Sequence, residues 1–239
     1  MKRLTIPLIF LLLFSQSACN QKVAPHREEA TPKSEDFGGL NRYSNANQVL
    51  MPAEKRVIFF GNSITEGWSD AHPEFFAGKP YVNRGISGQT TPQMLIRFRQ
   101  DVVALQPAAV VILAGTNDIA GNTGPTTLEA IFNNIVSMTE IAQANGIRVV
   151  ISSVLPVADY PWAPGLQPSE KIIRLNAMLK AYAGSNHCVY LDYHSAMKDE
   201  RNGLPVSLAR DGVHPTLEGY KMMEPMVERA IEEALNGQR

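Results

Sequence analysis

The chain has few cysteines and no excess of basic residues. With two Cys in 239 residues, a small fold held together by disulfides is excluded. The 22 Lys and Arg residues are balanced by 23 Asp and Glu residues, so the positive charge that sequence-independent nucleic-acid binding needs is missing. A hydrophobic content of 44% is more than a disordered chain carries. We therefore expect a folded globular protein with no nucleic-acid partner.

The apolar run near the N-terminus, residues 6–14, is also short. A helix that crosses a bilayer takes about 20 apolar residues, so this run is not predicted to span one. Lys2 and Arg3 precede the run, and the small residues Ser17 and Ala18 follow it, which is typical of a secretory signal. We predict a signal peptide over residues 1–19 and an exported protein.

Cys19, which follows Ala18, resembles the cysteine of a bacterial lipobox, which is lipidated and becomes the mature N-terminus. Gln16 stands where that motif usually has an aliphatic residue. We favour a lipoprotein anchored through Cys19 in the cell envelope, facing the periplasm or the cell surface. The alternative is an ordinary signal cut near Ser17 or Ala18. A membrane is expected as a partner only through such an anchor.

Beyond the signal, residues 20–39 are rich in polar residues and proline, which predicts a flexible tether. Residues 40–239 then suit one domain, in which residues 40–51 can form a short helix. Four apolar, β-rich runs are expected as strands: Val57–Phe60, Ala109–Leu113, Val149–Val154 and Cys188–Leu191. A fifth, short strand is expected to end at Asn83.

Amphipathic stretches between these runs predict helices. One begins with Thr91 as its N-cap, and another with Thr126 and Glu129 as a capping box. A third carries Ile172 to Leu179, and a fourth covers 217–235, broken near Glu224 because Pro225 lacks a backbone donor. Alternating strands and helices predict an α/β fold, a three-layer sandwich with a central parallel sheet, whose ligands sit beyond the carboxyl ends of the strands.

Four polar clusters follow these strand ends or lie near the C-terminus. Ser63 comes directly after the first strand, and Gly88 and Asn117 follow the second and third. The backbone amide of Gly88 and the side-chain amide of Asn117 are suitable donors to an oxyanion. Asp211 precedes His214 by three residues, so its carboxylate can orient the imidazole toward a serine hydroxyl. Taken singly, each cluster is ordinary turn or cap chemistry; together they predict a hydrolytic site.

This ordered combination resembles the SGNH hydrolases, also called the GDSL esterase and lipase family, over about residue 57 to the C-terminus. The matching blocks contain Ser63, Asn83 to Gly88, Gly115 to Asp118, and Asp211 to His214. Many members have Asp where this chain has Asn62. The resemblance implies a flavodoxin-like fold and is nearest the branch with platelet-activating-factor acetylhydrolase-like proteins.

The resemblance also implies the roles of the residues. Ser63 is the expected nucleophile, His214 the general base and acid, and Asp211 the residue that orients His214. The oxyanion hole is expected from the amides of Ser63 and Gly88 and from Asn117.

Other hydrolase mechanisms fit the sequence less well. The nucleophile elbow of α/β-hydrolases requires Gly where this chain has Thr65. The five His residues have no compact metal-ligand spacing, so we expect no metal and no cofactor. Cys188 is interpreted as a small buried apolar residue.

Aromatic and basic residues near the expected site are candidate substrate contacts. Tyr160 and Trp162 lie in a long connection after the fourth strand, while Trp68 and His72 follow Ser63, and Arg84 precedes Gly88. Two of these residues have an alternative role in the fold. Trp162 can instead anchor its proline-rich loop, and Arg84 can instead form a salt bridge.

The family and the export signal together predict an esterase that removes acetyl or other short acyl groups from small or carbohydrate esters. The alternatives are a lysophospholipase or thioesterase with the same triad, and a non-catalytic carbohydrate-binding surface lipoprotein. The sequence leaves the oligomeric state open.

Overall fold

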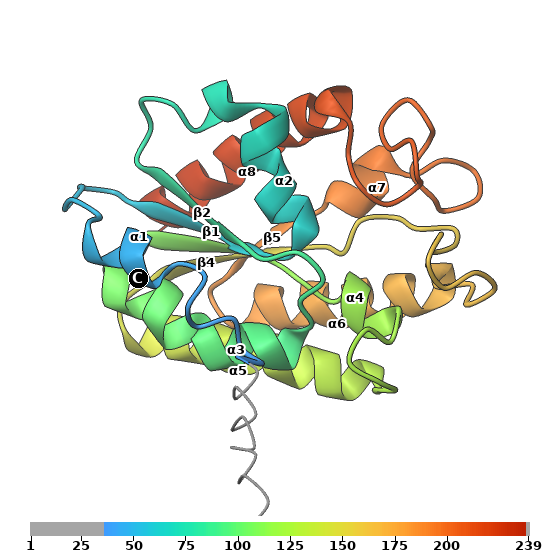
Figure 1. Ribbon diagram of the computed structural model, residues 1–239, viewed down its shortest axis with the longest axis horizontal. Helices are drawn as coiled ribbons and strands as arrows, with labels where there is room; N and C mark the ends of the chain where they lie inside the picture. The colour runs from blue at the N-terminus through green and yellow to red at the C-terminus, as the bar shows by residue number, and fades with distance from the viewer. Residues whose placement is uncertain (1–35, 238–239) are drawn as a thin grey trace, which may run out of the picture. The chain divides into compact units, whose positions relative to one another are not determined.

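The computed structural model describes residues 36–237. The predicted signal peptide, Cys19 and the tether up to residue 35 lie outside these described residues. The described chain contains one parallel sheet of five strands in the order β2-β1-β3-β4-β5 (Figure 1). The strands are β1 (Val57–Gly61), β2 (Tyr81–Gly85), β3 (Ala109–Leu113), β4 (Arg148–Ser152) and β5 (Val189–Leu191).

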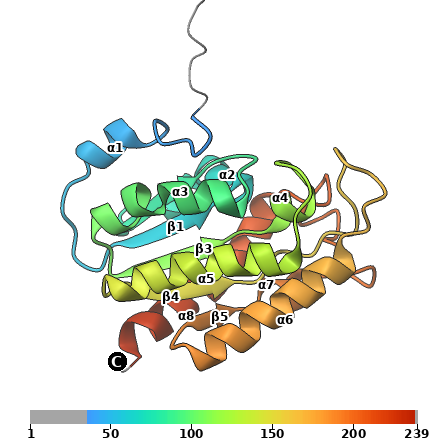
Figure 2. The same ribbon diagram turned by 90° about the horizontal axis from the view of Figure 1, so that it is seen from below.

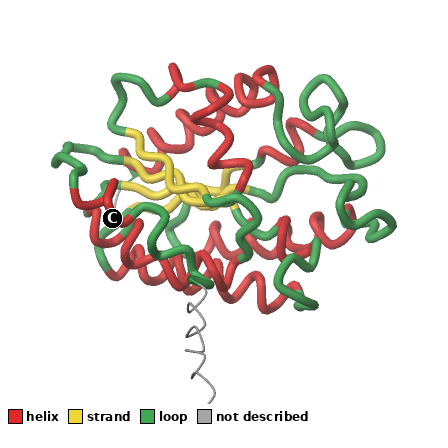
Figure 3. Tube along the Cα trace, in the orientation of Figure 1, coloured by secondary structure: helices red, strands yellow, loops and turns green. Residues whose placement is uncertain are grey.

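The helices form a layer on each face of the sheet, with α2 and α8 on one face and α3, α5 and α6 on the other (Figures 1 and 2). Their bounds are α1 (Ser44–Gln48), α2 (Ser63–Ala71), α3 (Thr91–Asp101), α4 (Thr116–Ile119), α5 (Leu128–Ala144), α6 (Ser169–Ser185), α7 (Tyr193–Met197) and α8 (Leu217–Asn236), with short 3₁₀ turns at Pro73–Phe75 and Val103–Leu105. Figure 3 shows the strands enclosed between the two helical layers. The predicted three-layer α/β fold is confirmed.

The core lies on both faces of the sheet because successive side chains of a strand point in opposite directions. In β1, Ile58 and Phe60 pack with α3 and α5, whereas Val57 and Phe59 pack toward α2 and α8. All four side chains are buried. A strand covered on both faces carries a continuous apolar run rather than an alternating one, as β1, β3 and β4 do, whereas the edge strand β2 is half-buried over Tyr81–Asn83 and carries no such run.

Two N-cap predictions require correction. The N-cap of α3 is Thr90 rather than Thr91, and it forms a capping box with Gln93. The N-cap of α5 is Thr127, whose hydroxyl accepts from the Ala130 amide, rather than Thr126. Each error is a single residue, because two adjacent threonines offer the same capping chemistry and only the backbone path decides between them.

The predicted break in α8 is also wrong. The helix continues from Leu217 to Asn236 with Pro225 inside it. Proline removes one backbone bond to the carbonyl of Lys221, which lies on the exposed side of the helix, where water can satisfy it. The opposite face buries Met223 and Val227 against the sheet. Packing of this face offsets the missing hydrogen bond.

Residues 36–51, here called the N-terminal strap, pass beside α3 and lead into β1 (Figure 2). Gln93 and Gln89 donate side-chain hydrogen bonds to the carbonyls of Phe37 and Gly38, each at 2.9 Å. Residues 36–39, expected in the tether, are thus bonded to the domain. No helix within residues 36–237 is both long and apolar enough to cross a bilayer.

Candidate active site

Three strand ends lie side by side at one edge of the sheet. Gly61 at the end of β1 pairs with Gly85 of β2 and Leu113 of β3. The turns that follow these residues therefore open at the same edge. The strand order reverses between β1 and β3, and ligands of open α/β sheets bind at such a switch point.

Close approach of β2 and α2 at this edge depends on Gly85. A Cβ atom there would lie 2.1 Å from the backbone nitrogen of Glu66 and 2.7 Å from the Asn62 carbonyl oxygen. Real Cβ contacts are not that short, so any side chain would force β2 and α2 apart. Glycine thus keeps the turn after β2 against the helix that begins at Ser63.

Ser63 is the first residue of α2, directly after its N-cap Asn62. The Asn62 side chain is buried and accepts a hydrogen bond from the Ile64 amide at 3.1 Å. Asn and Asp are about equally good N-caps, so Asn62 meets the local requirement of this turn without the aspartate that many family members have. The cap places the Ser63 hydroxyl at the sheet edge.

Ser63, His214 and Asp211 form a continuous line of hydrogen bonds. Ser63 Oγ lies 2.9 Å from His214 Nε2, and His214 Nδ1 lies 2.7 Å from Asp211 Oδ2. The backbone amides of Val213 and His214 donate to Asp211 Oδ1 at 2.9 and 2.8 Å. The short Asp-x-x-His turn after residue 210 thus fixes both partners of the imidazole contact.

Asp211 is electrostatically suited to orient the imidazole. Burial acts to raise the pKa of Asp211, but the hydrogen bonds from the His214 ring and from the His214 and Val213 amides outweigh burial and lower it. An ionised Asp211 favours the His214 tautomer with its proton on Nδ1. Nε2 is then left as an acceptor for the hydrogen bond of the Ser63 hydroxyl.

The candidate oxyanion donors lie on the same three turns. Within residues 36–237, the backbone amides of Ser63 and Gly88 have no hydrogen-bond acceptor in the protein. Gly88 has a φ of +76°, a conformation that favours glycine. Asn117 is buried and donates one amide hydrogen to the Gln89 carbonyl at 2.9 Å. This bond fixes the Asn117 amide and leaves its second hydrogen for another acceptor.

Trp162 and Tyr160, predicted together as substrate contacts, have different surroundings. Trp162 is 44% exposed, and its ring centroid lies 6.0 Å from that of His214. Tyr160 is 0% exposed, and its hydroxyl bonds to the hydroxyl and the carbonyl of Thr116 at 3.0 and 2.9 Å. Tyr160 therefore anchors the loop next to Asn117, and only Trp162 is available to a ligand.

Trp68 and His72 are not placed to contact a substrate, which corrects the prediction for Trp68. Trp68 is 2% exposed and stacks between Phe75 and Tyr220, with ring centroids 5.0 and 5.3 Å away. His72 Nδ1 lies 2.6 Å from Glu224 Oε1. Both residues belong to the α2–α8 interface because α2 turns its apolar face toward the core after Ser63.

Arg84 likewise serves the fold rather than a ligand. Its guanidinium donates to Asn47 of α1 and to the Asn83 carbonyl, at 2.9 and 2.8 Å, and lies over the ring of Tyr43. Burial lowers the pKa of Arg84. The side chain is occupied by the N-terminal strap and is nearly fully buried, so the predicted substrate contact is wrong.

The sequence did not assign Asp118 a role. Its Oδ1 accepts from the Thr91 amide and hydroxyl at 2.9 and 2.6 Å, which ties the turn with Asn117 to the start of α3. Burial raises the pKa of Asp118 against the opposing effect of these bonds. The only signal in the sequence for this role was the position of Asp118, which directly follows Asn117 in the turn after an apolar strand.

A pocket of about 520 Å³ begins beside Asn117, at Asp118. It lies between the segment after β3 and the loop that follows β4. Its lining combines apolar residues with charged ones, including Ile119, Leu128, Leu166, Glu129, Lys171 and Arg174. Asp118 is the lining residue next to Asn117, whereas Ser63, Gly88 and His214 do not line this pocket.

The fold and these turns define an α/β protein that carries hydrogen-bonded serine, histidine and aspartate side chains at the switch point of its sheet. The profile of the GDSL-like Lipase/Acylhydrolase family matches residues 59–222, and the chain belongs to this family. The family predicted from the four sequence blocks is confirmed.

Relatives agree with this assignment. A GDSL-like lipase from Bacteroides thetaiotaomicron is 48% identical, with a TM-score of 0.81 over 83% of this chain and 100% of that chain. The acetylxylan esterase of Geobacillus stearothermophilus is 25% identical over 67% of this chain and 74% of its own. The lipoprotein YqeF of Bacillus subtilis is 28% identical over 43% of this chain and 49% of its own, so that match spans about half the relative's length.

Proposed function

We propose that the protein is a serine ester hydrolase that removes acetyl or other short acyl groups from small or carbohydrate esters. The observation that carries this proposal is the hydrogen-bonded line from Ser63 through His214 to Asp211, with distances of 2.9 and 2.7 Å. Nucleophile, base and orienting acid are within hydrogen-bond reach, which is the geometry that nucleophilic acyl transfer requires.

In the proposed reaction, Ser63 Oγ attacks the ester carbonyl while His214 Nε2 takes its proton. The protonated imidazole, stabilised by Asp211, then delivers that proton to the departing alcohol, and the acyl group stays on Ser63 as an ester. A water molecule, deprotonated by His214, attacks this acyl-enzyme; the C–O bond to Ser63 then breaks, His214 returns the proton to Ser63 Oγ, and the carboxylic acid is released. The amides of Ser63, Gly88 and Asn117 stabilise the oxyanion in both tetrahedral intermediates.

The exposed ring of Trp162 supports a carbohydrate leaving group. It stands beside His214, the residue that protonates the leaving alcohol, and presents an apolar face with little rotamer freedom. A sugar ring stacked there would bring the alkoxy oxygen of one of its esters, which leaves as the alcohol, toward Nε2. The match to an acetylxylan esterase is in line with this substrate class.

The pocket beside Asn117 favours a second candidate, a lysophospholipase or thioesterase. A volume of about 520 Å³ is larger than an acetyl group needs, and Ile119, Leu128 and Leu166 supply apolar walls. Its charged lining, Lys171, Arg174 and Glu129, makes it a poor site for a long alkyl chain. We therefore keep the short acyl group as the first proposal.

The proposal for the location of the protein is an exported lipoprotein. It rests on the sequence around Cys19, and one relative is named a lipoprotein. Mass spectrometry of the mature protein from its native host tests it. An N-terminal diacylated cysteine supports an anchor at Cys19, and an unmodified N-terminus near Ser17 or Ala18 contradicts it.

The experiment that tests the activity compares hydrolysis of acetylated sugars, lysolipids and nitrophenyl esters of short and long acids. We expect Ser63→Ala to lose about 10⁵- to 10⁶-fold in kcat, while Ser185→Ala, at the exposed end of α6, keeps the wild-type rate. A preference for chains of about eight carbons or more, which would fill the apolar side of a pocket this size, would favour the second candidate.

A non-catalytic carbohydrate-binding protein is the remaining outcome. In that case the folded protein would hydrolyse none of these esters, and a fluorophosphonate would fail to label Ser63. Retention of sugar binding by Ser63→Ala alone does not support this outcome, because a catalytic serine is dispensable for ground-state binding.

A further inference from the structure

Glu66 connects the helix that carries Ser63 with the loop that carries Gly88. It lies one turn after Ser63 on α2, and its Oε2 accepts from the Ser87 backbone amide at 2.7 Å. The Ser87 hydroxyl donates to the same oxygen. Ser87 directly precedes Gly88, so one carboxylate sets the distance between the two turns that bear Ser63 and Gly88.

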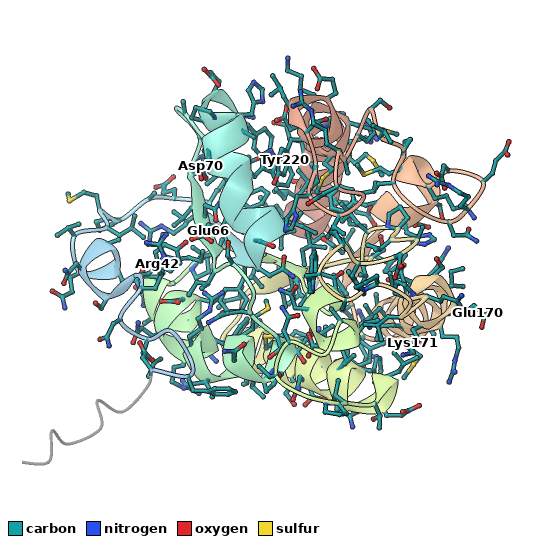
Figure 4. All side chains as sticks on the ribbon, turned by 45° about the vertical axis from the view of Figure 1, so that its right-hand side comes forward. Arg42, Glu66, Asp70, Glu170, Lys171 and Tyr220 are labelled. Carbon is teal, nitrogen blue, oxygen red and sulfur yellow. The ribbon has the colours of Figure 1, made fainter. Side chains whose placement is uncertain are left out.

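The second oxygen of Glu66 is held by the N-terminal strap. Arg42 donates to Glu66 Oε1 at 2.7 Å, and the two side chains lie together beside the start of α2 (Figure 4). Tyr43, the next residue, donates its hydroxyl to the Gly85 carbonyl. The strap thus contacts the start of the connection between β2 and Gly88 directly, at Gly85, and its end through Glu66, which accepts from Ser87.

The charge state of Glu66 suits this arrangement. Burial acts to raise the pKa of Glu66, but hydrogen bonds from Ser87 and Arg42 outweigh it and lower the pKa. The ionised carboxylate accepts all three of its donors at neutral pH. A neutral side chain of the same size would have to turn a donor toward either Ser87 or Arg42.

Among the described residues, Gly88 makes one hydrogen bond of its own, through its carbonyl, which accepts from the Asn122 side-chain amide at 3.2 Å. A Cβ atom on Gly88 would meet nothing within 4 Å, so no neighbouring side chain packs against that side of the residue. Its amide is useful to an oxyanion only if the amide hydrogen is held in the correct position before the reaction. The hydrogen bonds of Ser87 are therefore well placed to do this.

We propose that Glu66 is a positioning residue for the Gly88 amide of the oxyanion hole, and that Arg42 of the N-terminal strap holds Glu66 for this role. The proposal rests on the ester hydrolase function proposed above. The strap precedes residue 59, where the family match begins, so part of the support for the site comes from outside that match.

A structural role alone would give a different result. Arg42 is 55% exposed, and exposed ion pairs add at most about 1 kcal/mol to stability. Misplacing an oxyanion donor acts on the transition state and lowers kcat while leaving KM nearly unchanged. The two roles are thus separable by kinetics measured beside thermal unfolding.

The test compares Glu66→Ala, Glu66→Gln and Arg42→Ala with the matched control Lys79→Ala. Lys79 and Glu228 form an ion pair of 2.6 Å before the amino end of β2, at the sheet edge opposite Ser63. For each variant, kcat and KM on an acetyl ester, the Kd of an alkylboronic acid that forms a tetrahedral adduct with Ser63, and Tm are measured.

We expect Glu66→Ala to lower kcat about tenfold, less than the loss of a whole oxyanion donor, with KM within about twofold. The boronic acid should bind about tenfold more weakly as well. Arg42→Ala should lower kcat about threefold, because Ser87 still contacts Glu66. Glu66→Gln should lie between wild type and Glu66→Ala, and Lys79→Ala should leave kcat and Kd unchanged.

If the wild-type protein is active and this activity depends on Ser63, an unchanged kcat for Glu66→Ala would overturn the positioning role. A raised KM with unchanged kcat would overturn it too, by assigning Glu66 to substrate binding. If Glu66→Ala does not fold, Glu66→Gln and Arg42→Ala decide. A wild type without ester activity or fluorophosphonate labelling at Ser63 refutes the proposed function itself, which is a distinct result.

Discussion

Replacement of Arg97 by methionine is expected to destabilise the fold more than the loss of any exposed charge. Arg97 and Asp101 are both 0% exposed, and their nitrogen–oxygen distance is 3.1 Å. The guanidinium also donates to the carbonyls of Gly61 and Arg84, each at 2.9 Å, and to the Gln89 side chain at 2.6 Å. One side chain therefore joins the ends of β1 and β2 to the loop after Gly88.

The size of the effect follows from what the substitution leaves behind. Methionine fills much of the volume of Arg97 but leaves the Asp101 carboxylate without its buried partner and several acceptors without a donor. Removing one partner of a buried pair costs about 3–5 kcal/mol. At about 2–4 °C for each kcal/mol in a domain of this size, Tm should fall by roughly 6–20 °C.

The assay is thermal and urea unfolding at neutral pH, followed by circular dichroism. Arg201→Met is the control, because its pair with Asp199 at 2.9 Å is exposed at the arginine and should contribute less than about 1 kcal/mol. The double variant Arg97→Met with Asp101→Leu should recover part of the loss, since it also removes the unpaired charge. An Arg97→Met protein within about 1 kcal/mol of wild type would refute the reasoning.

Two further predictions concern Trp68 and Asp211. Trp68→Ala should lower the free energy of unfolding by about 3–5 kcal/mol because the ring is stacked in the core. Its KM for acetyl esters should stay within about twofold of wild type. A large rise in KM would instead support the predicted contact of Trp68 with the substrate. Because hydrogen bonds hold the pKa of Asp211 below its usual value, its stabilising contribution is present above that usual value and is lost as pH falls through the lowered pKa. The unfolding free energies of wild type and Asp211→Asn, measured from about pH 6 to about pH 2, should therefore converge at the acid end. A gap independent of pH would contradict this.

The sequence was sufficient to predict the fold and to select the residues that the structure brings together around Ser63. Strands buried on both faces carry continuous apolar runs, and four such runs were visible, whereas the edge strand β2 was expected only as a short strand ending at Asn83. Parallel strands also bring their carboxyl ends to one edge, so polar turns at residues 63, 88 and 117 were expected to meet. The roles of these residues in catalysis stay predictions until activity is measured.

Local ambiguity explains the smaller errors. Adjacent threonines at residues 90–91 and 126–127 offer identical caps, and their choice depends on the path of the incoming chain. Pro225 is unfavourable in an isolated helix, but packing of α8 on the sheet compensates for it. Propensity describes a segment alone, whereas the tertiary contacts act on the whole helix.

By itself the sequence determined the layered fold and the pairing of Asp211 with His214, because these follow from periodicity and from a spacing of three residues. The contact of Ser63 with His214, 151 residues apart, was expected from the family resemblance. Only the tertiary structure decided which aromatic residue is free beside His214 and which carboxylate holds Ser87. Trp68 and Trp162 are the same residue type, yet Trp68 is stacked in the core and Trp162 is exposed beside His214. The hydrogen bonds from Arg42 and Ser87 to Glu66 join three segments that are far apart in the sequence, and no local sequence pattern predicts contacts between such segments.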